Sequence, residues 1–456
     1  MRRPAAPAWL FLVLAATGCP PAAIEIAHEA QAADYSQFWP SKSCNNCHER
    51  LFTQYRSSAH AASFLNPVFQ AQLYGQILPR VGTEPGLKKE AASCLACHSP
   101  ITFLQHRGEI VPAEQVEPGL SGVTCDFCHT VRGYVGASPG DANYISEPGE
   151  LKGGPFKETS DWHHAYSALM TKSEFCATCH TAHNGHGVPL RTTYEEWQSS
   201  SYAKRGVQCQ DCHMSAKGFL VGGEAQFEAG RVAQMTVGTS PEAREKLFSH
   251  RFPGAHTSRQ VAGAMGVRVV PRPAPLKAGE AIQVEVVVEN TNVGHRMPSG
   301  SAELRAVWLE VRVGFSDEDP GVLLAASPRM TDRPPFDVVG ASPLEHHLLR
   351  QDAPAGSRVY RAVFADEAGV PTLTNHEART LLFDDRLEAS ESRHELYDFV
   401  VPKTFVPGTD LHVAVTLNYL RFPSLFADGL GQAHAEVTTI ATGSGIVGSP
   451  EEKDER

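Results

Sequence analysis

The stretch "FCATCHTAHNGHGVP", residues 175–189, decides how the first half of this chain folds, because it concentrates two cysteines and three histidines. Cys176 and Cys179 are three positions apart, and His180 follows at once. Two thiols at this spacing can add to the two vinyl groups of one haem, and the adjacent imidazole can then bind its iron. The alternative is a zinc site that also uses His183 and His186, since thiolates and imidazoles are zinc ligands.

The same Cys-x-x-Cys-His motif occurs five times and accounts for ten of the eleven cysteines. Its copies are Cys44, Cys47 and His48; Cys94, Cys97 and His98; Cys125, Cys128 and His129; Cys176, Cys179 and His180; and Cys209, Cys212 and His213. Zinc binding or disulfide pairing would explain the cysteines but not a histidine after every pair. The repeats therefore predict five covalently attached haem c groups, each with a motif histidine on its iron.

The spacing of the motifs indicates an internal repeat. Their first cysteines lie 50, 31, 51 and 33 residues apart, which is typical of a two-haem unit that is repeated and then truncated. The intervening sequence is rich in Gly and Pro, with short helical stretches such as "CHERLFTQYRSSAHAASF". We expect residues 35–262 to form a mostly helical or irregular cytochrome c domain whose core is packed with haem.

Sixteen further histidines are candidates for the sixth ligand of each iron, which separates electron carriers from enzymes. A second strong ligand closes the iron, whereas an open position can bind a substrate. The predicted distal ligands are His60, His163 or His164, His250, His256 and His295, so all or most haems are expected to be bis-histidine. His106 is a reserve candidate, and the roles of His183 and His186 stay open.

The N-terminus predicts export. Residues 1–19 read as a signal peptide, with Arg2 and Arg3 before an apolar stretch that is too short for a membrane-spanning helix. The segment "ATGC" resembles a lipoprotein cleavage box, so Cys19 is a candidate lipid anchor, and residues 20–34 read as a linker. The predicted location is periplasmic or associated with the outer membrane. A formal charge of −11 argues against nucleic acid as a partner.

From about Gly266 the chain consists of short valine-rich runs separated by Pro, Gly and Asp, which predicts an antiparallel β-sandwich over residues 263–442. The expected strands include "AIQVEVVVEN", "AVWLEVRVGF", "SRVYRAVFA" and "LHVAVTLNYLRF". His295 falls in a turn between two of them, from which its imidazole could reach a haem. Residues 443–456 read as a disordered tail. The predicted fold class is thus α+β, with a haem domain followed by a sandwich.

The haem segments "SCNNCHERLFTQYRSSAHA", "SGVTCDFCHTV" and "KSEFCATCH" resemble those of bacterial multihaem c-type cytochromes of the cytochrome c-554-like group. The stretch "VENTNVGHRMPSGSAELRAVWLEV" is similar to the C-terminal sandwich of many members. The resemblance covers about residues 35–320. It implies extracytoplasmic electron transfer with mainly bis-histidine haems, and distal roles for His60 and His295.

Two functions follow as expectations. The first is an electron carrier that passes electrons through its haems to or from a redox protein or a membrane electron-transfer complex. The alternative is a multihaem oxidoreductase that acts on a small nitrogen or sulfur compound at a haem without a distal ligand. Related reductases often have lysine in place of the motif histidine, and no Cys-x-x-Cys-Lys sequence occurs here. We find no catalytic residue beyond the haem ligands, so the electron carrier is the preferred interpretation.

Overall fold

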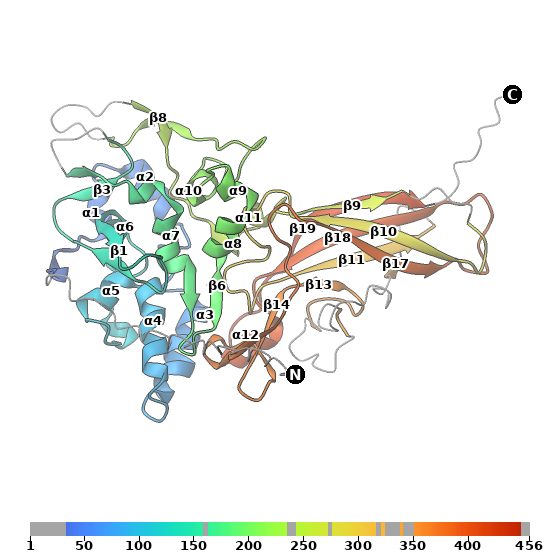
Figure 1. The fold of residues 1–456 in the computed structure, drawn as a ribbon, viewed down its shortest axis with the longest axis horizontal. Coiled ribbons are helices and arrows are strands. Elements are labelled where there is room, and N and C mark those ends of the chain that lie inside the picture. Colours follow the sequence, from blue (N-terminus) through green and yellow to red (C-terminus); the bar gives the residue numbers. More distant parts are fainter. Residues whose placement is uncertain are drawn as a thin grey trace, which may run out of the picture.

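The computed structural model describes residues 33–157, 163–234, 243–271, 276–315, 321–323, 338–340 and 351–447. The predicted signal peptide with Cys19 lies outside these residues, as does the tail after Val447. In the described part of the chain, no helix has the length and apolar character needed to cross a membrane. The chain forms two parts, one made of short helices and one of long strands, which adjoin at one end of the strands (Figure 1).

Short helices dominate the first part, and each Cys-x-x-Cys-His motif lies in or beside one of them. The helices are α1 (Ser41–Cys44), α2 (Glu49–Tyr55), α3 (Pro67–Gln70), α4 (Leu87–His98), α5 (Pro100–Gln105), α6 (Cys125–Thr130), α7 (Ser173–His180), α8 (Thr193–Ser199), α9 (Ser201–Lys204), α10 (Cys209–His213), α11 (Ser258–Val261) and α12 (Ser424–Leu430), the last lying in the strand-rich half. The strands of the first part are short, and each pairs with a strand close to it in the sequence. The pairs are β1 (Val131–Tyr134) with β2 (Tyr144–Ser146), β3 (Lys152–Gly154) with β4 (His164–Tyr166), β5 (Thr181–His183) with β6 (Pro189–Thr192), and β7 (Glu228–Arg231) with β8 (Ala243–Leu247).

The second part contains three sheets. One has the order β17-β10-β9, from β9 (Gly266–Val270), β10 (Ala281–Glu289) and β17 (Ser392–Val400). Another joins β12 (Val322–Leu323), β11 (Ala306–Gly314), β18 (Leu411–Leu420) and β19 (Thr438–Val447), with β13 (Arg358–Tyr360) also paired to β11. The third is formed by β14 (Ala362–Ala365), β15 (Pro371–Thr372) and β16 (Thr380–Asp384). All these pairings are antiparallel.

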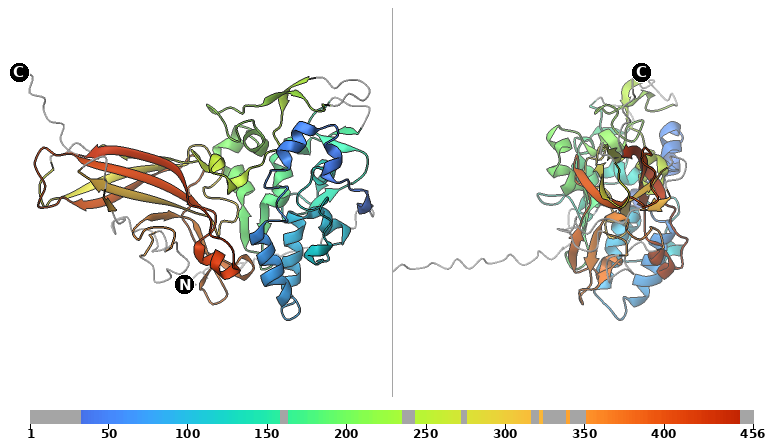
Figure 2. Two further views of the ribbon diagram at one scale, coloured as in Figure 1. Left: turned by 180° about the vertical axis from the view of Figure 1, so that it is seen from behind. Right: turned by 90° about the vertical axis from the view of Figure 1, so that its right-hand side faces the viewer.

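The two larger sheets share one apolar core. Side chains alternate between the faces of a strand, so every second residue of β10 points to the same side. Val284, Val286 and Val288 are accordingly buried, and they pack in one cluster with Leu309 of β11 and Val415 of β18. Figure 2 shows the long strands of both sheets side by side, at the opposite end of the molecule from α4 and α5. The mixed fold with antiparallel sheets is therefore confirmed at this level.

The observed strands differ from the predicted ones in two places. The expected strand at residues 357–365 is divided between β13 and β14, which belong to different sheets. Arg361 lies at the division, buried, and its Nη2 donates to the carbonyl of Glu303 at 2.8 Å. The last strand, β19, extends to Val447, beyond the predicted end of the sandwich at residue 442.

The helix expected around His60 ends earlier than its sequence suggests. α2 ends at Tyr55, and residues 56–65 form turns. Serine side chains can bond nearby backbone groups in competition with a helix. Ser57 Oγ donates to the carbonyl of Gln54 at 3.1 Å, and Ser58 Oγ accepts from the amide of Ala61 at 3.0 Å. His60 is therefore held in a turn.

Candidate haem-binding site

A cavity of about 1690 Å³ runs through the first part of the molecule to its junction with the sheets. All five motif histidines line it, as does every motif cysteine except Cys94. None of the ten motif cysteines is paired in a disulfide. The thiols and imidazoles needed to attach several haems therefore face one shared space, and the residues present fit the cofactor that the motifs predict.

Four of the five motif histidines face a second histidine across this cavity. The ring centres are 6.0 Å apart for His48 and His163, 6.3 Å for His60 and His180, 6.3 Å for His129 and His250, and 6.4 Å for His213 and His295. Two metal–nitrogen bonds of about 2 Å, plus about 1.1 Å from each nitrogen to its ring centre, give about 6.2 Å. Each pair thus has the separation needed to hold one metal ion between two imidazoles.

Hydrogen bonds at Nδ1 orient several of these rings. An imidazole that binds a metal through Nε2 carries its proton on Nδ1, and that N–H usually donates to a carbonyl or carboxylate. In His48, Nδ1 lies 3.0 Å from the carbonyl oxygen of Val232. In His250, Nδ1 lies 2.9 Å from the carbonyl oxygen of Phe248, and in His295 it lies 2.8 Å from that of Arg296. These contacts place the proton on Nδ1 and leave Nε2 free as a ligand.

Burial keeps three of the facing histidines, His60, His213 and His250, in the neutral form that binds metals. Burial, followed by the nearby histidines, lowers the pKa of His60 to about 3. Burial also lowers the pKa of His213 and of His250 to about 4. Their imidazoles are therefore unprotonated at neutral pH.

His98, in the second motif, has a different environment. Its Nδ1 is 3.1 Å from the carbonyl oxygen of Ser63, so Nε2 is free, as in the other motifs. The ring of Phe69 stacks on its face, with the centres 4.2 Å apart and the planes at 9°. Among the described residues, no histidine ring faces His98 as in the other four pairs.

The remaining candidate histidines make other contacts. His164 directs Nε2 to the carbonyl oxygen of Phe156 at 2.7 Å, so this nitrogen is a donor. His256 lies in the cavity wall with Nδ1 2.9 Å from Arg421 Nη1. His106 and His186 are exposed. His183 is also exposed and pairs with Asp141 at 3.1 Å, which raises the pKa of His183.

Cysteine thiols from different motifs also meet. Three pairs of thiols lie close enough to shift one another's pKa: Cys44 with Cys125, Cys97 with Cys179, and Cys176 with Cys209. Since each Sγ marks the edge where a porphyrin would attach, these contacts bring together the first motif with the third, the second with the fourth, and the fourth with the fifth.

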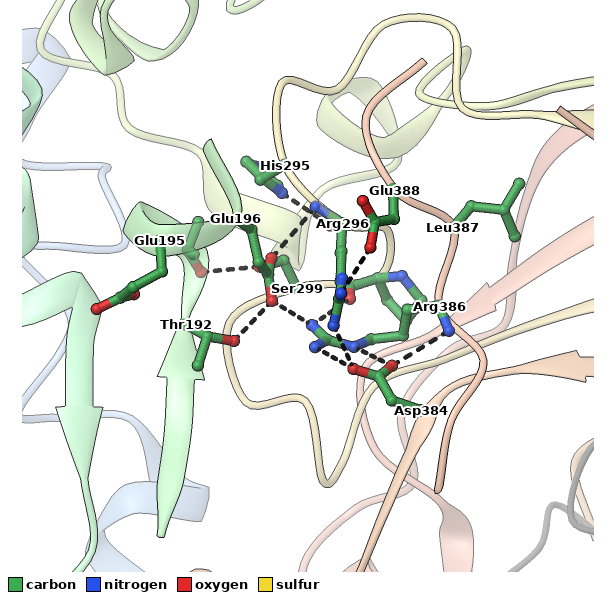
Figure 3. Close-up of polar contacts among 12 residues, drawn as sticks. Thr192, Glu195, Glu196, His295, Arg296, Ser299, Asp384, Arg386, Leu387 and Glu388 are labelled. Atoms are coloured by element: carbon green, nitrogen blue, oxygen red, sulfur yellow. Dashed lines mark hydrogen bonds and ion pairs between the residues drawn. The ribbon is translucent and has the colours of Figure 1, made fainter. Parts of the chain in front are cut away.

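A polar network fixes the His295 turn against α8 (Figure 3). Glu196 Oε2 accepts from the amide of Arg296 at 3.2 Å, and Glu196 Oε1 pairs with Arg386 Nη1 at 2.8 Å. Arg386 also binds Asp384 through two of its nitrogens, each at 2.8 Å. The side chains of Glu196 and Arg386 are 5% and 4% exposed, so this contact between the two parts is buried. No sequence motif indicated these residues.

Comparisons with known proteins found a family model and a solved structure that are similar to this chain. The family model "Cytochrome c554 and c-prime" matches residues 43–130. No curated protein matches the chain. The penta-heme cytochrome c552 from Thermochromatium tepidum is 18% identical over 90% of this chain and 99% of its own, with a TM-score of 0.59, and so has a similar fold.

Two other solved structures have much lower structural similarity to this chain. AvmM, which catalyses macrocyclization in alchivemycin A biosynthesis, is 11% identical over 42% of this chain and 93% of its own, with a TM-score of 0.18. A family 123 glycoside hydrolase from Clostridium perfringens is 7% identical over 41% of this chain and 28% of its own, with a TM-score of 0.15. Residues 43–130 are thus similar to the cytochrome c554 and c-prime family, and the chain as a whole has a fold similar to that of a penta-heme cytochrome c552.

Proposed function

We propose that this protein transfers electrons through five covalently attached haems, four of them with two histidine ligands. The observation that carries the proposal is the set of four facing histidine pairs, with ring centres 6.0–6.4 Å apart. Haem supplies the reversible one-electron chemistry, and a second histidine on the iron excludes other ligands. The chain contributes the ligands, their orientation and the exclusion of water.

The thiol contacts support an order for the haems. The first motif adjoins the third through Cys44 and Cys125, and the fourth adjoins both the second and the fifth. Cys128 in the third motif also lies near Cys179 in the fourth. We therefore infer a path from the first haem through the third to the fourth, which branches to the second and the fifth.

The proposed function includes a redox partner and an extracytoplasmic location. A formal charge of −11 favours a redox partner with a positively charged surface, either a soluble protein or a membrane complex. We propose that the protein is exported, that Cys19 is its lipid anchor, and that residues 263–442 form a β-sandwich that docks on the haem domain and supplies His295.

A second function is favoured by one observation, the absence of a facing histidine at His98 among the described residues. The haem attached through Cys94 and Cys97 would then have an open position, at which a small nitrogen or sulfur compound could be oxidised or reduced. The neighbouring haems would deliver or remove the electrons. This function uses the same path and adds a reaction at one of its branches.

The spin states of the holoprotein test both functions. We expect the pyridine haemochrome assay to give five haems c and electron paramagnetic resonance to give four low-spin haems and one high-spin haem. Nitrite or hydroxylamine should perturb only the high-spin signal, because the other irons have both positions filled. Five low-spin haems without a response would exclude the second function. More than one high-spin haem would contradict the proposed histidine pairs.

The adjacent residues His163 and His164 provide a matched pair of variants. Replacing His163 with alanine should add a high-spin haem, because His163 faces His48 at 6.0 Å. Replacing His164 should leave the spin states unchanged, because its Nε2 is used by the carbonyl of Phe156. The two variants are compared by electron paramagnetic resonance at equal haem content. The opposite outcome would assign the ligand to His164.

A further inference from the structure

Four side chains that could bind an anion gather where the strands meet the haem cavity. His256 comes from the short helix η6 (Gly254–His256), Arg305 precedes β11, Tyr419 lies in β18, and Arg421 follows β18. His256, Arg305 and Tyr419 line the cavity. Arg421 contacts His256 at 2.9 Å, and Arg305 Nη1 donates to the carbonyl of Arg421. We refer to these four residues as the arginine cluster.

The contact with Arg421 determines which nitrogen of His256 carries the proton. A guanidinium can only donate, so Nδ1 of His256 must accept and the hydrogen lies on Nε2. A histidine that binds iron through Nε2 needs the opposite arrangement, which His250 and His295 have through their carbonyl partners. His256 therefore presents an N–H donor, and iron ligation through Nε2 does not fit this contact.

Positive charge and an unused donor remain in the cluster. Among the described residues, no carboxylate lies within ion-pair distance of Arg305 or Arg421; the salt bridges at this junction involve other residues, such as Arg296 and Arg386. The side chain of Tyr419 is 2% exposed, and its hydroxyl has no hydrogen-bond partner among the described residues. Leaving a buried hydroxyl without a hydrogen bond is unfavourable, so such a group usually has a partner in the functional molecule.

We propose that the arginine cluster binds an anionic group with two oxygens, namely a haem propionate or a small oxyanion from solution. Two arginines, an imidazole N–H and a phenol would together supply the charge and the donors that such a group requires. The inference rests on the proposed occupation of the cavity by haem, and it gives His256 a role other than that of an iron ligand.

The chain segment that leads to His256 packs against histidines of two proposed haems, the third and the fourth. The carbonyl of Phe252 accepts from the amide of Ala59 at 3.0 Å, and the Phe252 ring is 4.6 Å from that of His60, which faces His180. His256 is four residues further along the same segment. His250, which faces His129, lies in the same segment and its ring is 6.0 Å from that of Phe252, so a propionate of the haem held at His180 or at His129 is the candidate ligand.

Two substitutions test the proposal in the holoprotein. Arg421→Gln removes a charge, and Tyr419→Phe removes only the hydroxyl, which has no protein partner that would be lost. Arg268→Gln, at an exposed position of β9, is the matched control. Midpoint potentials are measured by spectroelectrochemistry. If a propionate is bound, Arg421→Gln lowers the potential of one haem, because oxidised iron is favoured when a nearby positive charge is removed. Tyr419→Phe shifts that same haem, and the control shifts none.

A second measurement distinguishes the source of the anion. If the ligand is a small oxyanion, nitrate, which is a weak iron ligand, should shift the potential of one haem when it is added to the wild type, and Arg421→Gln should weaken the binding of nitrate at least tenfold in the same spectroelectrochemical measurement. If neither substitution changes a potential and added nitrate has no effect on the wild type, the proposal is wrong. A new high-spin haem in His256→Ala would also overturn it, because His256 would then be an iron ligand. The haem count and spin states of the wild type test the proposed function separately.

Discussion

Replacing His295 with alanine is expected to convert the haem at Cys209 and Cys212 from low spin to high spin and leave the other haems unchanged. The imidazoles of His213 and His295 are nearly parallel, at 9°, with centres 6.4 Å apart. Removing one of them opens a position on the iron, and no other described histidine ring is paired with His213. Electron paramagnetic resonance should show one additional high-spin haem per molecule.

Added imidazole provides the rescue for this variant. It should enter the space left by the side chain and restore the low-spin signal without any change elsewhere in the chain. His394→Ala, on the exposed side of β17, is the matched control, since that histidine pairs with Glu285 and not with a motif histidine. A spectrum of His295→Ala that equals that of the wild type would reject the ligation of iron by the strand-rich half.

The haem-attachment residues and several strands could be predicted from sequence because both depend on short-range patterns. Two thiols and an imidazole must lie within five positions to serve one haem, so each motif is visible locally. Alternating valines likewise identify β10 and β11. The sequence also predicts a turn at His295, because this residue lies between the two strands. The ring of His295 lines the cavity and faces His213.

The distal partners could not be assigned in the same way. His48 faces His163 and His129 faces His250, and each pair is separated by more than a hundred residues. Such pairs depend on how turns and hairpins return to the cavity, which no local pattern encodes. The choice between His163 and His164 depends on the carbonyl of Phe156, which is a tertiary contact.

The buried pairing of charged side chains at the junction of the two parts could not be predicted from the sequence either. Glu196 reads as a surface residue of a helix, and Arg386 as a loop residue. Charged residues are almost never fully buried unless they are paired, and the pairing becomes evident only in three dimensions. Burial of this pair explains how a turn from the strand-rich half can be held accurately enough to present His295.

Arg386→Ala is expected to destabilise the junction strongly. Removing one partner of a buried ion pair typically costs about 3–5 kcal/mol, because the other charge is left uncompensated. Here both Glu196 and Asp384 lose a partner at 2.8 Å, although Arg296 still contacts Asp384 at 2.8 Å. Urea denaturation followed by circular dichroism should give a lower midpoint. Arg268→Ala, on the exposed surface of β9, should stay within about 0.5 kcal/mol.

A compensating substitution separates lost charge from lost packing. Glu196→Gln combined with Arg386→Ala removes one uncompensated carboxylate, so the double variant should recover part of the stability lost in Arg386→Ala. Residues in direct contact typically show interaction energies of about 0.5–3 kcal/mol in such a cycle. If the two effects simply add, the ion pair does not stabilise the junction.

The pH dependence gives the sharpest test of this mechanism. Burial alone would raise the pKa of Asp384, but Arg386 and Arg296 outweigh it and hold the pKa below its usual value. A lowered pKa adds stability above about pH 3.9, the value in the unfolded chain, and this stability is lost only when the pH falls through the folded value. The wild type should therefore keep this contribution between about pH 7 and pH 4. In Arg386→Ala, Asp384 keeps only Arg296 as a partner, so burial is opposed less and the pKa of Asp384 is higher than in the wild type. The variant therefore gains less stability from the ionised carboxylate at neutral pH, and it loses less as the pH falls. The difference between the two proteins should narrow towards pH 4, and a constant or widening difference would show that the loss is one of packing alone.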